Sequence, residues 1–244
     1  MKDFLEKFSS FKPKVIFLVH ARRHLLQDMW APHTTINMAE RNRYGDTPLH
    51  VAAFKGDWQQ VKVLLQDKAV DVNASNNYGD TPIHYSVAQE QLEVLKVLLA
   101  PSTGVDVNAV DQDSYAPLHY ASYIGHVKMI QVLLDHVNIN VNIVDKHANT
   151  PLHYAAFSGH ASALKALLSS KLIDVNSKNQ HANTPLYYAA WQGHVEAVQA
   201  LVATTGIELM VKNKYGHTPF DAANGDRHSE CLELLYHAVH KKGH

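Results

Sequence analysis

Thr150-Pro151-Leu152-His153 is the stretch that decides the fold, because five variants of it recur along the chain at nearly constant spacing. The six tetrapeptides begin 34, 35, 34, 34 and 34 residues apart. They start at Thr47, Thr81, Ala116, Thr150, Thr184 and Thr218. A fixed period of this length predicts a solenoid, in which each unit packs only on its neighbours and stacking supplies the core.

The residues that follow Thr150 predict two helices in each unit. Thr is a favoured N-cap, and Pro151 occupies the first helical position, where its missing N–H costs nothing. Gly159 is expected to end this first helix, since Gly adopts left-handed backbone angles without penalty. Leu164 and Leu167 then recur at helical spacing and predict the buried side of a second helix. The unit is therefore expected to be helix, loop, helix and turn.

A turn is predicted before each tetrapeptide. The stretch Asn76 to Gly79 has Asx first and Gly fourth, as a type I turn favours. Ser114, Ala148 and Ala182 replace that Gly in three units. If the backbone is left-handed there, each replacement is expected to cost on the order of 1 kcal/mol.

This pattern resembles the ankyrin repeat, and it covers residues 35–240 in six copies. The resemblance implies an all-α solenoid of helix-loop-helix-turn units. Residues 1–34 are interpreted as an N-terminal helical capping segment, with helices over Asp3 to Phe11 and Val15 to Trp30; a separate binding tail is the alternative. The resemblance also implies that four asparagines are candidates for hydroxylation by a suitable oxygenase. They are Asn73, Asn108, Asn142 and Asn176.

Charge and cysteine content exclude some classes of function. The net charge of −1 leaves no overall field to attract nucleic acid or a membrane. Residues 1–45 carry a net charge of +4, from eight Lys/Arg and four Asp/Glu. A single cysteine, Cys231, rules out an internal disulfide and favours an intracellular, cytoplasmic location, with the nucleus or delivery into a host cell as alternatives. The apolar run Val15 to Val19 is too short to cross a bilayer.

Eighteen histidines suggest metal or catalytic chemistry, but their positions favour structural roles. The resemblance implies that His50, His84, His119 and His153 tie neighbouring turns together, and His126, His160 and His194 follow the predicted helix-ending Gly. His237 and His240 are spaced to share a metal but lack a third ligand. Cys231 lies three residues after His228 and is interpreted as a buried helix cysteine, because other repeats have Val or Leu there. We therefore expect no catalytic residue, metal site or cofactor.

The resemblance implies that a partner protein binds the concave side, at turn tips and the exposed face of each first helix. One predicted row lies seven residues after the start of each tetrapeptide and is mostly aromatic: Phe54, Ala88, Tyr123, Phe157 and Trp191. The predicted tip contacts are Tyr44, Tyr78, Asp113, His147, His181 and Tyr215. Tyr115 is added as one of the residues just before a tetrapeptide, all of which are expected to point the same way. Aromatic side chains are enriched at binding hot spots.

A second row is expected to lie between repeats with its hydroxyls in water: Tyr85, Tyr120, Tyr154 and Tyr188.

The favoured function is that of a monomeric, non-catalytic adaptor, scaffold or inhibitor that has no small-molecule substrate. Intracellular bacteria also use proteins of this kind as effectors. The alternatives are an enzyme that uses Cys231 and the histidines, or nucleic-acid or anionic-lipid binding through four basic residues near the N-terminus. Those residues are Lys12, Lys14, Arg22 and Arg23.

Overall fold

The computed structural model describes residues 40–225 and 227–241 of the 244-residue chain. The described residues form twelve helices and no strand. The predicted capping segment 1–34 lies outside them. The first helices of the six pairs are α3 (Pro48–Lys55), α5 (Pro82–Ala88), α7 (Pro117–Ile124), α9 (Pro151–Phe157), α11 (Pro185–Trp191) and α13 (Pro219–Gly225). The second helices are α4 (Trp58–Leu64), α6 (Leu92–Leu98), α8 (Val127–Leu134), α10 (Ala161–Leu168), α12 (Val195–Val202) and α14 (Ser229–Lys241).

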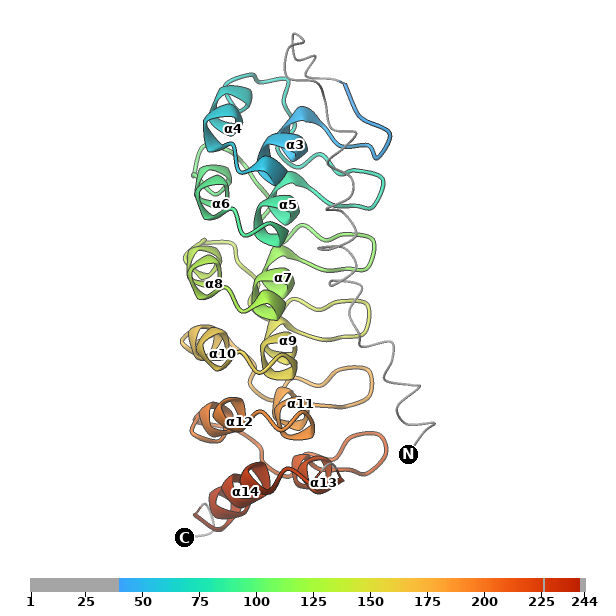
Figure 1. The fold of residues 1–244 in the computed structure, drawn as a ribbon, viewed down its shortest axis with the longest axis vertical. Helices are drawn as coiled ribbons and strands as arrows, with labels where there is room; N and C mark the ends of the chain where they lie inside the picture. Colours follow the sequence, from blue (N-terminus) through green and yellow to red (C-terminus); the bar gives the residue numbers. More distant parts are fainter. Residues whose placement is uncertain (1–39, 226, 242–244) are drawn as a thin grey trace.

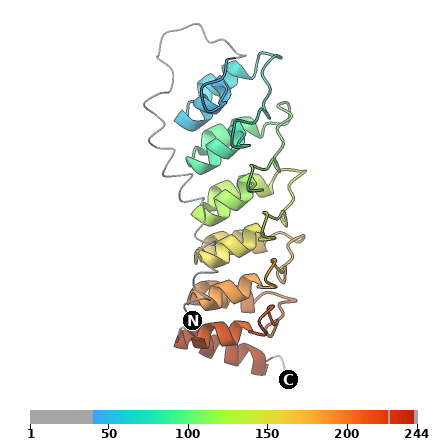
Figure 2. The same cartoon turned by 90° about the vertical axis from the view of Figure 1, so that its right-hand side faces the viewer.

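The helices form two parallel columns, which confirms the all-α solenoid. The first helices stack in one column, the second helices in another, and the loops before each first helix project away from both (Figure 1). Turned by 90°, the same array shows the helix pairs as successive layers (Figure 2). We number these layers as repeats 1 to 6, from α3–α4 to α13–α14.

The helix ends follow the tetrapeptide chemistry. Thr150 has an extended backbone (φ −91°, ψ 166°), and Pro151 is the first residue of α9. Gly125 ends α7 in the left-handed conformation, with φ 82°. A Cβ atom built on Gly125 would lie 2.5 Å from the imidazole of His160 in the next repeat, so that position combines a positive φ with a close approach.

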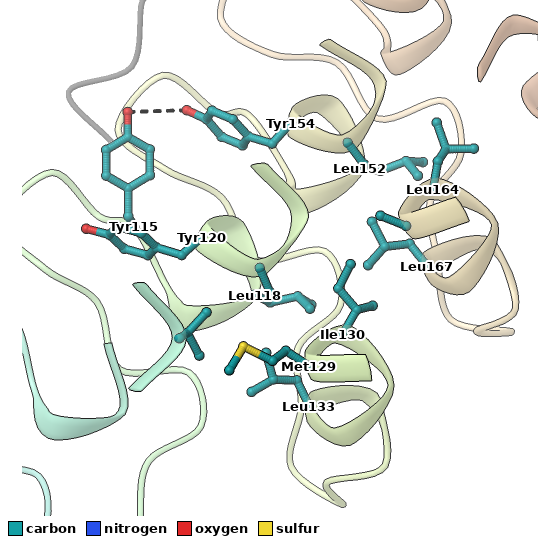
Figure 3. Close-up of a cluster of buried hydrophobic side chains, with 14 of the residues drawn as sticks. Tyr115, Leu118, Tyr120, Met129, Ile130, Leu133, Leu152, Tyr154, Leu164 and Leu167 are labelled. Carbon is teal, nitrogen blue, oxygen red and sulfur yellow. Dashed lines mark hydrogen bonds between the residues drawn. The ribbon is translucent and has the colours of Figure 1, made fainter. Parts of the chain in front are cut away.

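Large apolar side chains from both helices of a repeat are buried against the neighbouring repeats. Leu118 of α7 and Leu133 of α8 are both 0% exposed. They pack with Met129 and Ile130 beside Leu152 and Leu164 of the following repeat (Figure 3). Alanine on the first helices, such as the fully buried Ala155, leaves room for neighbouring helices to approach closely. The core is thus one continuous seam through the array, as the periodic sequence requires.

We call the six-residue segments before the tetrapeptides the hairpins: residues 41–46, 75–80, 110–115, 144–149, 178–183 and 212–217. Successive hairpins are joined by backbone hydrogen bonds. The N–H of Gln180 donates to the carbonyl of His147 (3.0 Å), and the N–H of Lys214 donates to that of His181 (2.9 Å). Five such bonds connect all six hairpins into one row, which restricts the motion of each hairpin against the next.

Ser114, Ala148 and Ala182 have φ values of 64°, 61° and 58°. They are therefore left-handed at the position where Gly45, Gly79 and Gly216 serve in the other hairpins. The left-handed backbone on which the expected cost depends is therefore present at these three residues, and the cost itself stays a prediction.

Candidate functional site

The predicted aromatic row lies at the C-terminal ends of the first helices. Tyr123, Phe157 and Trp191 are half-buried, whereas Phe54 is only 6% exposed. The expectation that Phe54 is exposed is therefore wrong: its ring packs edge-on against Tyr85 of repeat 2, with centroids 5.8 Å apart, and belongs to the buried hydrophobic core. Ala88 of repeat 2 is also half-buried, so the accessible aromatic side chains of the row lie in repeats 3 to 5, and we call Tyr123, Phe157 and Trp191 the aromatic row.

Each ring of the aromatic row also supports the packing between repeats. Tyr123 meets Tyr154 edge-on at 6.3 Å, and Phe157 meets Tyr188 edge-on at 6.0 Å. Trp191 contacts both Phe157 and Tyr188, each at 6.3 Å. One side of each ring is thus held by protein while part of its surface reaches solvent.

The second tyrosine row lies between repeats, as predicted, but its hydroxyls are not in water. The Tyr120 hydroxyl donates to Asp111 (2.7 Å) and the Tyr154 hydroxyl donates to Asp145 (2.6 Å). In repeat 5 the acceptor is Tyr188, which receives a bond from the amide of Asn179 (2.8 Å). Burial raises the pKa of Tyr154 well above the ordinary tyrosine value and raises that of Tyr188 to about 12. The expectation failed because the partner of each hydroxyl is the first Asx of its own hairpin, nine residues earlier.

The residues just before the tetrapeptides do not form a surface row. Tyr115 is 5% exposed, so its assignment as an accessible contact is wrong. Its hydroxyl lies 3.3 Å from that of Tyr154, and burial raises its pKa to about 12 (Figure 3). Asn149 and Asn183 are fully buried, and their side-chain carbonyls accept bonds from the next hairpin's Asx, at 2.8 and 2.9 Å. These side chains point along the array and bond one hairpin to the next.

The tips of the hairpins are more accessible. Tyr78 and Tyr215 are 42% and 45% exposed. The other predicted tip contacts, Tyr44, Asp113, His147 and His181, are half-buried. The rings of His181 and Tyr215 stack at 6.3 Å, and the Arg43 guanidinium lies 4.8 Å from the Tyr44 ring centroid.

The tetrapeptide histidines join neighbouring repeats. The Nδ1 atom of His153 accepts from the backbone N–H of Thr150 (3.1 Å), so its Nε2 carries the proton and donates to the carbonyl of Asn183 in the next repeat (3.0 Å). His50, His84 and His119 make the same pair of contacts. Burial lowers the pKa of His119 and of His153 to about 4, which keeps both rings neutral. The expectation that these histidines tie turns together is confirmed.

The residues considered for catalysis or metal binding lie apart from one another or make contacts within the protein. Cys231 is fully buried in α14, as predicted, and burial raises the pKa of its thiol. The Nε2 atom of His228 bonds to the carbonyl of Trp191 (3.1 Å). The part of the chain that the structure describes holds no group of three His, Cys, Asp or Glu residues suited to a metal ion.

Within the same ranges, no helix is long and apolar enough to span a membrane. Lys12, Lys14, Arg22 and Arg23 lie outside the described residues.

Comparisons with known proteins agree with this architecture. Residues 21–111 and 102–179 match a family model described as ankyrin repeats in three copies, and residues 167–223 match one described as ankyrin repeats in many copies. The structure is similar to that of EF0377, an ankyrin repeat protein, with 27% identity over 77% of this chain and 96% of that chain and a TM-score of 0.71. It is also similar to an ankyrin repeat domain, ABAYE2397, from Acinetobacter baumannii AYE, with 27% identity over 79% of this chain and 97% of that chain and a TM-score of 0.71. No match was found among curated proteins.

Proposed function

The chain belongs to the ankyrin-repeat family, whose repeats generally serve as protein–protein interaction modules, and from this premise we propose that it is a non-catalytic adaptor, scaffold or inhibitor that binds one partner protein. The partner contacts the concave side of the array, over the aromatic row and the adjoining hairpin tips. The observation that carries this proposal is the partial exposure of three aromatic side chains in three consecutive repeats.

The aromatic row has the properties of a binding anchor. Tyr123, Phe157 and Trp191 each keep part of the ring in solvent while the rest packs on a neighbouring aromatic ring. Such pre-packed rings lose little rotamer freedom on binding, so burying their exposed area stabilises a complex at small entropic cost. Neighbouring helices lie about 8–10 Å apart, so three layers present a strip roughly 20 Å long.

The hairpin tips extend this strip sideways. Tyr78, His147, His181 and Tyr215 differ in size and polarity while the framework beneath them is repeated. Because the hairpins are bonded to one another, these varied side chains are held at fixed spacing. A fixed set of different side chains on a common framework favours selection of one partner over others.

The test compares two triple variants as baits in quantitative affinity purification from cell extract. Y123A/F157A/W191A removes the aromatic row, and V63A/V137A/L172A removes three exposed apolar side chains on the side of the second helices. We expect a partner that is retained by the wild-type protein and by the second variant but lost with the first. Circular dichroism melts establish that both variants are folded. Equal retention by the two variants would remove the aromatic row as the contact surface.

We further infer that the protein is a monomer. We also infer that it acts in a reducing compartment, because its single thiol is buried and forms no disulfide. Light scattering after size exclusion, at concentrations from 1 to about 100 µM, tests the first point. A mass near 27.3 kDa at every concentration supports it, and a concentration-dependent dimer contradicts it.

A further inference from the structure

The charge of the hairpins changes sign along the array. The hairpins of repeats 2 and 3 contain three acidic residues, Asp80, Asp111 and Asp113, and no Lys or Arg. The hairpins of repeats 4 to 6 contain four lysines and a single acidic residue, Asp145. Those lysines are Lys146, Lys178, Lys212 and Lys214.

In repeats 4 to 6 the positive charges are on the surface and the negative one is not. All four lysine residues are exposed. Asp145 is only 4% exposed and accepts a hydrogen bond from the Tyr154 hydroxyl. Lys146 pairs with Asp113 at the border with repeat 3. Within residues 40–225 and 227–241, Lys178, Lys212 and Lys214 form no ion pair. The hairpins of repeats 4 to 6 therefore present a surface with positive charge that no exposed carboxylate of their own offsets.

The pKa of His181 reflects the positive charge on these hairpins. The pKa of His181 is lowered first by partial burial and then by the positive charge of Lys214. The nearest acidic residue on the following helix is Asp221 at the start of α13. Its exposed carboxylate accepts hydrogen bonds from the Thr218 N–H (2.8 Å) and hydroxyl (2.7 Å). These bonds first, and the nearby charge of Lys212 more weakly, lower the pKa of Asp221, so this carboxylate offsets part of the charge of Lys212 and leaves Lys178 and Lys214.

The spacing of these charges is fixed by the bonded hairpins. Besides the backbone bonds described above, the Gln180 amide donates to the carbonyl of Lys146 (2.7 Å), which joins repeats 4 and 5 a second time. Neighbouring repeats lie about 8–10 Å apart, and an extended polypeptide advances about 3.3 Å per residue. One repeat therefore corresponds to about three residues of an extended ligand.

We propose that the hairpins of repeats 4 to 6 bind an extended acidic segment of the partner protein, with a carboxylate at about every third residue. This inference rests on the proposed function and adds the chemistry of the partner. Complementary charge raises the rate of encounter and fixes the register of the segment. The hairpins of repeats 2 and 3 contain no Lys or Arg, and their Asp80 and Asp111 are buried, so they offer no positive charge to the segment, which is held over repeats 4 to 6.

The test uses a fluorescein-labelled peptide of four Glu-Ser-Ser units, measured by fluorescence anisotropy. We expect binding at 50 mM salt that weakens at least tenfold at 300 mM, because exposed charges are screened over about 8–10 Å near physiological ionic strength. The variant K178E/K212E/K214E is expected to lose at least tenfold in affinity. K128E/K165E/K171E makes the same change of net charge at exposed positions of α8, α10 and the loop after α10, and it is expected to bind as the wild type does.

Three outcomes would overturn the proposal: no binding of the peptide at 50 mM salt, an equal loss in both triple variants, or tighter binding of a 12-nucleotide single-stranded RNA than of the peptide. The last outcome would assign the surface to nucleic acid. A failed peptide test combined with loss of the natural partner from Y123A/F157A/W191A would remove the acidic segment alone and leave the proposed function standing. If the aromatic variant retains that partner and the peptide binds, the aromatic row is removed as the contact surface and the acidic segment is retained.

Discussion

The Tyr154 hydroxyl donates a 2.6 Å hydrogen bond to the carboxylate of Asp145, and both residues are almost completely buried. The same carboxylate accepts from the amide of Asn149 (3.2 Å), the residue just before the tetrapeptide. A first helix is in this way bonded to its own hairpin. The position of the hairpin tips, and so of the candidate binding surface, depends on such contacts in repeats 2 to 5.

Tyr154→Phe removes only the hydroxyl and leaves Asp145 without one of its donors. We expect a loss of about 1–3 kcal/mol in the free energy of unfolding, because a buried charged acceptor is left less well satisfied. Urea denaturation followed by circular dichroism measures it. Tyr236→Phe, at a position 52% exposed on α14, is the control and is expected to change the free energy by less than about 0.5 kcal/mol. Equal effects of the two substitutions would contradict the structural role of the hydroxyl.

Replacing left-handed alanines with glycine is expected to stabilise the array. Ala148→Gly and Ala182→Gly each relieve the cost of a Cβ atom at positive φ, which outweighs the extra entropy that glycine gives the unfolded chain. We expect a gain of about 0.5–1 kcal/mol for each and near-additivity for the pair. The reverse change, Gly216→Ala, meets no atom within 4 Å and is expected to cost about 1 kcal/mol through backbone strain alone. Destabilisation by either glycine would contradict the assignment.

Stability is expected to fall as the pH is lowered from about 6.5 towards 4. The folded-state pKa values of His119 and His153, about 4, lie below their unfolded value, so the unfolded chain binds protons first. Each histidine then removes up to about 1.4 kcal/mol per pH unit across this window. The raised pKa of Asp111, which is caused mainly by burial, acts in the opposite direction as the pH falls from its folded-state pKa to the ordinary value of 3.8, and it offsets part of the loss.

Urea titrations at pH 7.5, 6.0 and 5.0 measure this dependence, and NMR of the histidine ring protons assigns it. Ring resonances of His119 and His153 that do not titrate above pH 5 are expected. Titration of either ring near pH 6.5 would show that it is charged in the folded protein and would contradict the account.

Cys231 is expected to react slowly with an alkylating agent in the folded protein and rapidly in urea. The thiol is fully buried, and its raised pKa keeps it protonated at neutral pH. Mass spectrometry after timed exposure to iodoacetamide measures the rate, with free cysteine as the reference. Labelling of the folded protein as fast as free cysteine would revive the hypothesis of a nucleophilic thiol.

The repeat architecture was predictable because each tetrapeptide sets several local features at once. Thr150 and Pro151 begin α9, and apolar residues recur at helical spacing in every copy, so the six copies give independent support for the same assignment. The spacing could not reveal which side chains face the neighbouring hairpin. Tyr115 and Tyr154 belong to different repeats, 39 residues apart, and their contact forms only when the layers stack.

The exposure of the aromatic row was predictable only in part. Phe54 and Phe157 hold equivalent positions and both meet a tyrosine of the next repeat, yet Phe54 is buried and Phe157 is half-buried. Periodicity assigns a position to a face and does not give the area that remains exposed there. A usable signal was nevertheless present for the tyrosine hydroxyls, since Asn or Asp stands nine residues before each of Tyr85, Tyr120, Tyr154 and Tyr188.

The most direct test of the central claim is the affinity of the identified partner for purified Trp191→Ala, measured by calorimetry beside wild type and Leu172→Ala. Loss of an anchor at the centre of an interface costs about 2 kcal/mol or more, so the dissociation constant for Trp191→Ala should rise at least about 30-fold. Leu172→Ala, at a position 74% exposed outside the proposed surface, should leave it within twofold. An unchanged constant for Trp191→Ala, or a larger loss for Leu172→Ala, would contradict the claim that partners bind at the aromatic row.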